Sequence, residues 1–359
     1  MRRTLAILAS AAAAASVLAL APSAHAAETI SGGGASFPYP FIEACRADFN
    51  AAAGQKNVND NFNIQYQSTG SGTGKSNFAK GTFVYAQTDS KYADGAATQS
   101  WTWTYVPNIG GAIAFPINLR STTTQKTLGS SIQLKQTTLA KILGGNITMW
   151  NAPEILADNP LIAKQIPAQA ITVVYRAGNS GTSNNTLQYL NAWAPTIFSA
   201  VKDDFSTAFP GGKPPATALS AKDSATLIAT VNGTAGAIGY VDYSDAKGYP
   251  VARIQNALGE FVAPSVQSAG KTLALQTDVQ PNGLVKLNYN VKLKGAYPAV
   301  IFSYGLGRTD GNGPNGLGVR QFESYIIGKC GPARAAQLGY VPVGGAVLQT
   351  ALKLAATIK

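Results

Sequence analysis

Three short loops of this chain combine glycine with hydroxyl side chains, a composition that suits the binding of a small oxyanion. They span residues 34–38, 69–72 and 176–183, and the last begins with Arg176. Glycine lets backbone N–H groups approach a ligand closely, hydroxyl groups donate hydrogen bonds, and arginine presents a charged fork of donors. Any one such stretch is more often only a turn. The three together predict a socket rich in hydrogen-bond donors.

The first residues predict export from the cytoplasm. Arg2 and Arg3 precede an apolar stretch, residues 5–20, and small residues at Ala24 and Ala26 suit cleavage by a signal peptidase. We therefore expect residues 1–26 to be a signal peptide. A retained N-terminal anchor is the alternative.

Removal of that peptide would remove His25, the only histidine of the chain. Without an imidazole, the mature protein could build neither a Ser-His-Asp nor a Cys-His catalytic site, nor a histidine-based zinc or iron site. The two cysteines, Cys45 and Cys330, are expected to form one disulfide in an oxidising compartment. Two free buried thiols remain the alternative, and we expect neither a metal nor a cofactor.

The formal net charge of +11 at pH 7 does not point to nucleic acid. The basic residues are dispersed, and no run of five or more occurs. A surface that attracts small anions fits this pattern better.

Strand and helix patterns alternate along the chain, which predicts an α/β architecture. The clearest unit is a β-branched strand over residues 170–175, followed by the arginine loop and a helix over residues 184–193. This order places backbone N–H groups and the positive end of a helix dipole at the loop. We also expect Ser36 to cap a helix that begins near Pro38, and residues 250–284 to be rich in loops.

Residues 70–76 superficially resemble a nucleotide-binding P-loop, because Gly74, Lys75 and Ser76 follow a glycine-rich stretch. That motif requires another glycine at position 69, which is Thr69 here. We therefore do not interpret the segment as a nucleotide site.

The three loops, taken together, resemble those of the periplasmic phosphate-binding proteins of ABC importers and of the related DING proteins. The intervening segments 138–151, 236–241 and 338–342 are also similar, so the resemblance spans essentially the whole mature chain. It implies a two-lobe periplasmic-binding-protein fold of type II, with the ligand cleft between the lobes. We place lobe one at residues 27–111 and 242–359, and lobe two at residues 112–241.

The resemblance also implies the phosphate-binding residues. Ser36 and Phe37 match the hydroxyl and the backbone N–H of the first loop, and Ser71 matches the hydroxyl of the second. Asp89 and Arg176 match a ligand-contacting aspartate and the anion-binding arginine. The donors at the start of the following helix correspond to Ser180, Gly181 and Thr182.

One position departs from the family pattern. The family usually has an aspartate two residues after the arginine, which pairs with it, whereas this chain has Gly178. Arg176 is therefore expected to be held in another way.

The resemblance implies a function in transport. We expect an exported, monomeric protein of the periplasm, also released outside the cell in some settings, that captures inorganic phosphate and delivers it to an ABC permease of the inner membrane. It would be no enzyme, and its mechanism would be binding with hinge closure. The alternatives are a secreted DING-like phosphatase and a surface interaction protein. The former lacks an acidic cluster for two metal ions, and the latter leaves the loops without a shared role.

Overall fold

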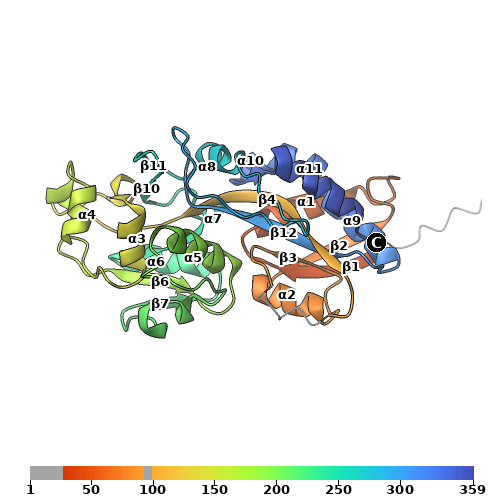
Figure 1. The fold of residues 1–359 in the computed structure, drawn as a ribbon, viewed down its shortest axis with the longest axis horizontal. Coiled ribbons are helices and arrows are strands. Elements are labelled where there is room, and N and C mark those ends of the chain that lie inside the picture. Colours follow the sequence, from red (N-terminus) through yellow and green to blue (C-terminus); the bar gives the residue numbers. More distant parts are fainter. Residues whose placement is uncertain (1–26, 93–98) are drawn as a thin grey trace, which may run out of the picture.

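A computed structural model describes residues 27–92 and 99–359 (Figure 1). The predicted signal peptide and His25 lie outside these residues. The strands are β1 (Glu28–Gly34), β2 (Phe62–Ser68), β3 (Tyr85–Thr88), β4 (Trp103–Ala114), β5 (Gln133–Leu134), β6 (Thr172–Arg176), β7 (Leu219–Ala221), β8 (Ala237–Gly239), β9 (Val241–Asp242), β10 (Arg253–Gln255), β11 (Phe261–Val262), β12 (Val300–Arg308) and β13 (Val341–Pro342). The α-helices are α1 (Tyr39–Ala51), α2 (Ser71–Ala79), α3 (Gln136–Leu143), α4 (Pro153–Asp158), α5 (Gly181–Trp193), α6 (Ser224–Gly233), α7 (Tyr243–Ala246), α8 (Val266–Leu273), α9 (Pro314–Tyr325), α10 (Gly331–Leu338) and α11 (Gly345–Ala356).

One large sheet organises the half of the molecule that holds both described ends of the chain, here called the first lobe. Its strands lie in the order β13-β4-β12-β3-β1-β2, and β1 pairs in parallel with both β2 and β3. At the end of β1, Gly34 has φ +139°, and a Cβ there would lie 2.1 Å from the carbonyl oxygen of Gln87 in β3. Only glycine allows these backbones to approach so closely. The approach brings the first loop next to the end of β3.

The other half, the second lobe, is built around β6. Strands β7 and β8 pair with β6 in parallel, and α5 and α6 lie beside them (Figure 1). The end of β4 pairs with β9, so the chain crosses between the lobes near the predicted boundaries at residues 111/112 and 241/242. A small sheet joins β10 and β11 to β5 of the second lobe, although the predicted boundary assigns β10 and β11 to lobe one. The lobe boundaries remain a proposal.

The interior is largely one continuous hydrophobic cluster that reaches into both lobes. It includes residues from α1 such as Phe41 and Phe49, and residues from the second lobe such as Trp150 and Leu187. A smaller cluster lies around β6 and α6 and includes Val174 and Leu227. The sheets therefore pack on hydrophobic cores, and the donor-rich loops follow the C-terminal ends of β1, β2 and β6.

One local prediction is wrong, and another is incomplete. Ser36 does not cap α1, because the helix begins at Tyr39 with Pro38 at the N-cap, and the Ser36 hydroxyl contacts the second lobe instead. Residues 250–284 are mostly loop, as predicted, but they also contain α8. Ser265 caps its first turn and accepts a hydrogen bond from the Ser268 backbone N–H at 3.0 Å. That serine was the overlooked sequence signal for a helix start. None of the helices within the described residues is long and apolar enough to cross a membrane.

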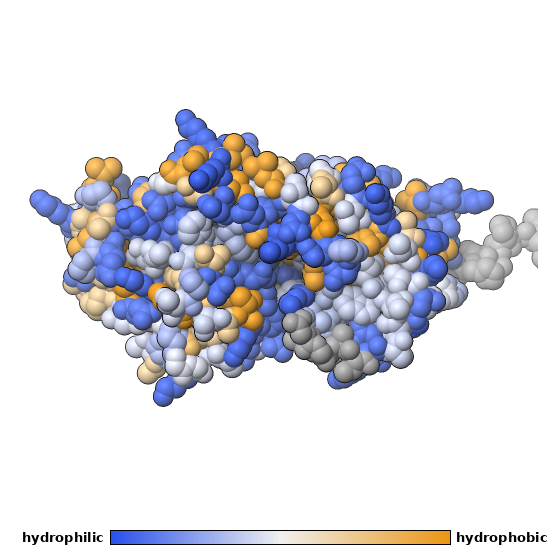
Figure 2. Space-filling view, viewed as in Figure 1, coloured by the Kyte–Doolittle hydropathy of each residue, from blue (hydrophilic) through white to orange (hydrophobic). Residues whose placement is uncertain are grey.

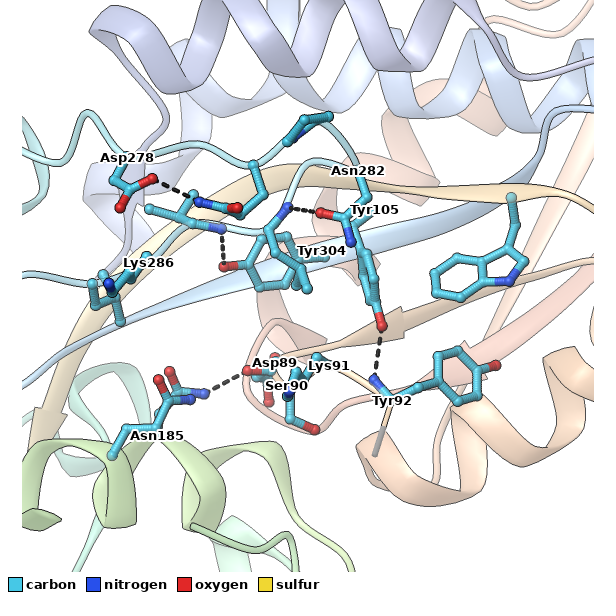
Figure 3. Close-up of a pocket in the computed structure, with 17 residues that line it drawn as sticks. Asp89, Ser90, Lys91, Tyr92, Tyr105, Asn185, Asp278, Asn282, Lys286 and Tyr304 are labelled. Atoms are coloured by element: carbon cyan, nitrogen blue, oxygen red, sulfur yellow. Dashed lines mark hydrogen bonds between the residues drawn. The ribbon is translucent and has the colours of Figure 1, made fainter. Parts of the chain in front are cut away.

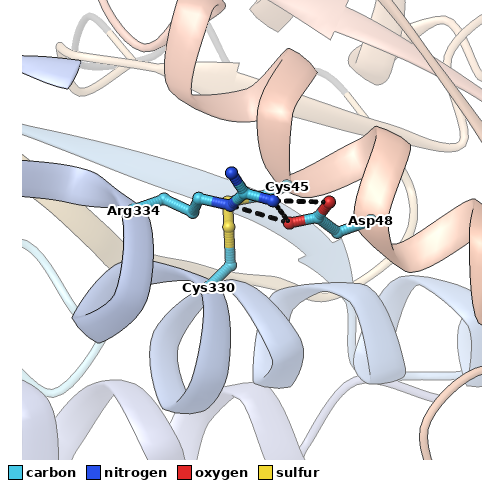
Figure 4. Close-up of a disulfide and its surroundings, with 4 residues drawn as sticks. All are labelled: Cys45, Asp48, Cys330 and Arg334. Atoms are coloured by element: carbon cyan, nitrogen blue, oxygen red, sulfur yellow. Dashed lines mark hydrogen bonds and ion pairs between the residues drawn. A yellow bond between two sulfur atoms is a disulfide. The ribbon is translucent and has the colours of Figure 1, made fainter. Parts of the chain in front are cut away.

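The predicted disulfide is present and joins two helical segments of the first lobe. Cys45 of α1 and Cys330 lie with their Cα atoms 5.6 Å apart, and both side chains are buried. Beside them, Arg334 of α10 donates two hydrogen bonds of 2.9 Å to Asp48 of α1 (Figure 4). The bond ties the first helix to the C-terminal part of the chain.

Because the disulfide closes a loop across a separation of 285 residues, its removal should destabilise the protein. The double variant Cys45→Ala/Cys330→Ala should lose about 2–5 kcal/mol of unfolding free energy, since the unfolded chain gains freedom. Urea unfolding followed by circular dichroism measures this loss. A reducing agent should shift the wild-type midpoint to that of the variant and leave the variant unchanged. Equal midpoints for oxidised and reduced wild type would contradict the prediction.

Candidate functional site

The site is centred on the guanidinium group of Arg176, at the end of β6. Its side chain is buried, with 3% of the residue exposed. Nη1 donates hydrogen bonds of 3.2 Å to the hydroxyl oxygens of Ser36 and Ser224, and Nη2 donates to the backbone carbonyl of Lys222 at 3.4 Å. Its Nε has no hydrogen-bond partner within residues 27–92 and 99–359. A full positive charge thus lies between the two lobes, and its Nε–H group is available to donate a hydrogen bond to a ligand.

The N-terminus of α5 supplies neutral donors. Ser180 is the N-cap, and its hydroxyl oxygen accepts a hydrogen bond from the Ser183 backbone N–H at 3.3 Å. Thr182 is 1% exposed, and its hydroxyl is a buried group that lacks a partner in the described part of the chain. A helix N-terminus carries partial positive charge and free N–H groups. These features suit an anion.

The first lobe faces α5 with a carboxylate and a hydroxyl. Asp89 follows β3, and its carboxylate accepts hydrogen bonds from Ser303 at 2.7 Å and from Ser71 at 3.3 Å. The side-chain amide of Asn185, in α5, donates to the backbone carbonyl of Asp89, a contact across the lobes (Figure 3). A Cβ on Gly181 would lie 2.4 Å from the Ser71 hydroxyl and 2.7 Å from the Asp89 carboxylate. The lobes are therefore in direct contact here, and only glycine fits.

Burial dominates the electrostatics of Asp89. Desolvation raises the pKa of Asp89 to about 7, although the hydrogen bonds from Ser303 and Ser71 and the nearby charge of Arg176 act in the opposite direction. The carboxyl group therefore changes its protonation state near neutral pH.

The structure brings seven of the eight predicted ligand residues together at this lobe interface through these contacts. The eighth, Phe37, was predicted to contribute only its backbone N–H. Its ring packs edge-on against Tyr340, with ring centroids 5.4 Å apart, and its carbonyl accepts a hydrogen bond from the Tyr340 hydroxyl at 2.7 Å. Its side chain thus belongs to the core, and only its backbone remains for a ligand.

Sequence reasoning missed Ser224 and Asp242. Ser224 is the first residue of α6, and its hydroxyl donates to Asp242 at 3.3 Å while accepting from Arg176. Asp242 is fully buried, and burial followed by the charge of Asp245 holds its pKa well above the usual range. Burial also raises the pKa of Asp245 to about 6, and Arg176 lowers the pKa of both groups. The capping residue Asp223 before Ser224 was the available sequence signal.

These contacts explain how the chain manages without an aspartate at position 178. Gly178 is exposed and has φ +69°, a left-handed conformation that glycine adopts readily. Within the described residues, Arg176 forms no direct ion pair. It is held by hydroxyls and a carbonyl, and Ser224 links it to Asp242.

Two cavities flank the site. One, of about 910 Å³, opens beside Asp89 and Asn185 and is lined by aromatic residues that include Tyr105 and Tyr304 (Figure 3). The other, of about 900 Å³, is lined by α2, the start of α5 and the loop that contains Asp203. Hydrophilic residues gather on the surface between the two halves (Figure 2). No cluster of three or more residues suited to a metal ion occurs in the described part of the chain.

Comparison with known proteins identifies relatives along most of the chain. Residues 19–329 match the PBP superfamily domain. The phosphate-binding protein PstS of Xylella fastidiosa is 32% identical over 67% of this chain, and the match spans 60% of that protein's length. The phosphate-binding protein PstS3 of Mycobacterium bovis is 30% identical over 78% of this chain and 75% of its own.

A solved structure shows that the fold is shared. The periplasmic phosphate-binding protein PfluDING, bound with phosphate, superposes with a TM-score of 0.69 at 21% identity, over 90% of this chain and 92% of its own. The predicted two-lobe α/β fold is confirmed.

The raised pKa of Asp89 predicts that the phosphate-free protein loses stability as pH rises. Between the ordinary pKa of 3.8 and the folded value of about 7, the folded state keeps a proton that the unfolded state has lost. The stabilisation is complete below pH 4 and disappears by pH 7, with a slope approaching about 1.4 kcal/mol per pH unit for each such group. Asp245 and Glu323, whose pKa values are about 6 and about 7, act in the same direction.

Thermal unfolding between pH 5 and pH 8, in a buffer free of phosphate, measures this dependence. Asp89→Asn should show a shallower decline than the wild type because one titrating group is missing. Identical pH profiles would mean that Asp89 does not titrate in this window.

Proposed function

The chain belongs to the PBP superfamily and groups within it with the PstS phosphate-binding proteins, and from this membership we propose that it captures inorganic phosphate between its lobes and delivers it to an ABC-type permease. The observation that carries the proposal is a pair of buried groups, the guanidinium of Arg176 and the Thr182 hydroxyl at the start of α5, whose Nε and Oγ1 atoms lack a hydrogen-bond partner among the described residues. Both are donors that a buried oxyanion would satisfy, and an unsatisfied buried donor is costly. Export to the periplasm and action as a monomer belong to the same proposal.

The proposed ligand set joins residues from both lobes. Its members are the hydroxyl groups of Ser36, Ser71, Ser180 and Thr182, backbone N–H groups at Phe37 and Gly181, the carboxyl group of Asp89 and the guanidinium group of Arg176. We add Ser224, whose hydroxyl lies within hydrogen-bond distance of both Ser36 and Arg176. Phosphate binding would bridge the lobes and favour the closed arrangement.

Asp89 is proposed to select for a protonated anion. Phosphate near neutral pH carries at least one proton, whereas sulfate carries none. A carboxylate can accept a hydrogen bond from the phosphate hydroxyl but meets only lone pairs and like charge on sulfate. Because burial raises the pKa of Asp89 to about 7, the carboxylate form that discriminates against sulfate predominates only above neutral pH.

We do not propose an enzyme. Hydrolysis of a phosphate ester needs an activated nucleophile or a metal-bound water. The side chains around Arg176 are hydroxyls, amides and carboxyls that already hydrogen-bond to one another. An assay of p-nitrophenyl phosphate hydrolysis, with and without added divalent metal ions, separates a binding protein from a DING-like phosphatase.

Arg176→Ala should weaken phosphate binding by about 2–4 kcal/mol, because the buried charge is removed while the helix donors remain. Isothermal titration calorimetry measures the change. Arg334→Ala provides the matched control, since it removes one positive charge from a surface ion pair beside the disulfide and should leave the affinity unchanged. If Arg176→Ala binds phosphate as tightly as the wild type, the phosphate site must lie elsewhere.

At pH 8, where Asp89 is mostly ionised, the wild-type protein should bind phosphate, accept arsenate as a competitor and reject sulfate by a factor of roughly 10⁴, because sulfate has no proton to donate to the Asp89 carboxylate. Asp89→Asn should reduce the difference in affinity between phosphate and sulfate, since an amide can donate a hydrogen bond to sulfate and a carboxylate cannot. Competition calorimetry with the three anions gives the ratios. If the wild-type protein binds sulfate as strongly as phosphate, it is a general oxyanion binder and Asp89 does not select for phosphate.

A further inference from the structure

Lys75, in the glycine-rich segment that superficially resembles a P-loop, is buried although it carries a charge. It lies on α2 with 6% of the residue exposed. Its Nζ donates to Asp203 Oδ2 at 2.7 Å, to the Ser90 hydroxyl at 2.9 Å and to the backbone carbonyl of Lys91 at 2.7 Å. An ammonium group has three donors, and all three are used. The lysine is therefore committed to a structural contact.

Its partner Asp203 belongs to the second lobe and is tied to the start of α5. The backbone carbonyl of Asp203 accepts a hydrogen bond from the Ser180 N–H at 2.9 Å, and Oδ1 accepts from the Asn184 side-chain amide at 2.9 Å. Ser180 is the N-cap of the helix that faces Asp89 and Ser71. One carboxylate thus connects Lys75 of the first lobe to the anion-binding turn of the second.

The environment of the pair makes it stronger than a surface ion pair. The side chains of Lys75 and Asp203 are 8% and 17% exposed, so water screens their attraction only partly. A backbone hydrogen bond of 3.3 Å, from the Gly72 N–H to the Asn179 carbonyl, also joins α2 to the loop that precedes α5. Separation of α2 from α5 would break the ion pair and expose both groups to water.

We infer that Lys75 and Asp203 form a cross-lobe latch that holds the closed site together and limits the rate at which the bound anion leaves. The inference rests on the proposed function for the identity of the anion, which is phosphate. The latch acts through α5 and touches no ligand, so Lys75 and Asp203 are positioning residues. Its effect falls mainly on dissociation, because the ion pair exists only after the lobes have met.

The test compares Lys75→Met, Asp203→Asn and the double variant with the wild type. Release of radiolabelled phosphate into an excess of unlabelled phosphate gives the dissociation rate. Each single variant should release phosphate at least about tenfold faster, and the double variant should be no faster than the singles, because all three lack the same pair. Lys75→Arg, which keeps the charge, should recover part of the slow release. Lys141→Met breaks an exposed ion pair with Glu154 within the second lobe and should behave as the wild type.

Two further measurements separate the possible failures. Circular dichroism establishes whether each variant is folded. If Lys75→Met does not fold, Asp203→Asn still tests the latch, because asparagine keeps the shape of the aspartate. Small-angle X-ray scattering of the phosphate-free proteins should give a larger radius of gyration for the latch variants than for the wild type. A wild type that binds no phosphate refutes the proposed function, while the scattering still tests the latch. Unchanged release rates, or unchanged scattering where no phosphate binds, overturn the latch.

Discussion

The burial of the Arg176 guanidinium between two lobes is the constraint on which the site depends. A buried charge is costly unless hydrogen bonds compensate it. Here the compensation comes from both sides of the lobe interface, from Ser36 in the first lobe and Ser224 in the second. Neither lobe alone supplies all the hydrogen-bond acceptors of the guanidinium group. The guanidinium group therefore has all of these hydrogen-bond partners only when the two lobes are in contact.

The surrounding carboxyl groups adjust to the same buried environment. Asp89 and Asp242 are both buried within reach of the Arg176 charge, and desolvation raises the pKa of each. A protonated carboxyl group can donate a hydrogen bond, while an ionised one can only accept. The charge of this buried site therefore depends on pH.

Close contacts between backbones explain why glycine recurs in the binding loops. Gly34 lets β1 approach β3, and Gly181 lets α5 approach Ser71 and Asp89. Any side chain at Gly181 would separate the lobes, which would also lengthen the ion pair between Lys75 and Asp203. The disulfide acts elsewhere, between α1 and the C-terminal helices of the first lobe. Stability of the lobe and closure of the cleft are therefore supported by different residues.

Much of the fold and part of the site could be predicted from the sequence. The strand, arginine loop and helix around Arg176 follow from local periodicity, because β-branched runs, glycine and an N-cap serine act over a few residues. The disulfide followed from the expected compartment and from having only two cysteines. Ser36 was misassigned, since a serine that can cap a helix locally can equally bind a distant arginine, and only packing decides between them.

The contacts between segments far apart in the chain required the tertiary structure. Ser224 and Asp242 are ordinary residues of a helix start and a strand end until folding places them beside Arg176. Lys75 resembles a nucleotide-binding lysine until α2 meets the loop that holds Asp203, 128 residues later in the chain. The sequence by itself determined the elements and the chemical character of the loops, because these depend on neighbouring residues. The tertiary structure decided the partners of each charge, because burial and pairing depend on which elements pack together.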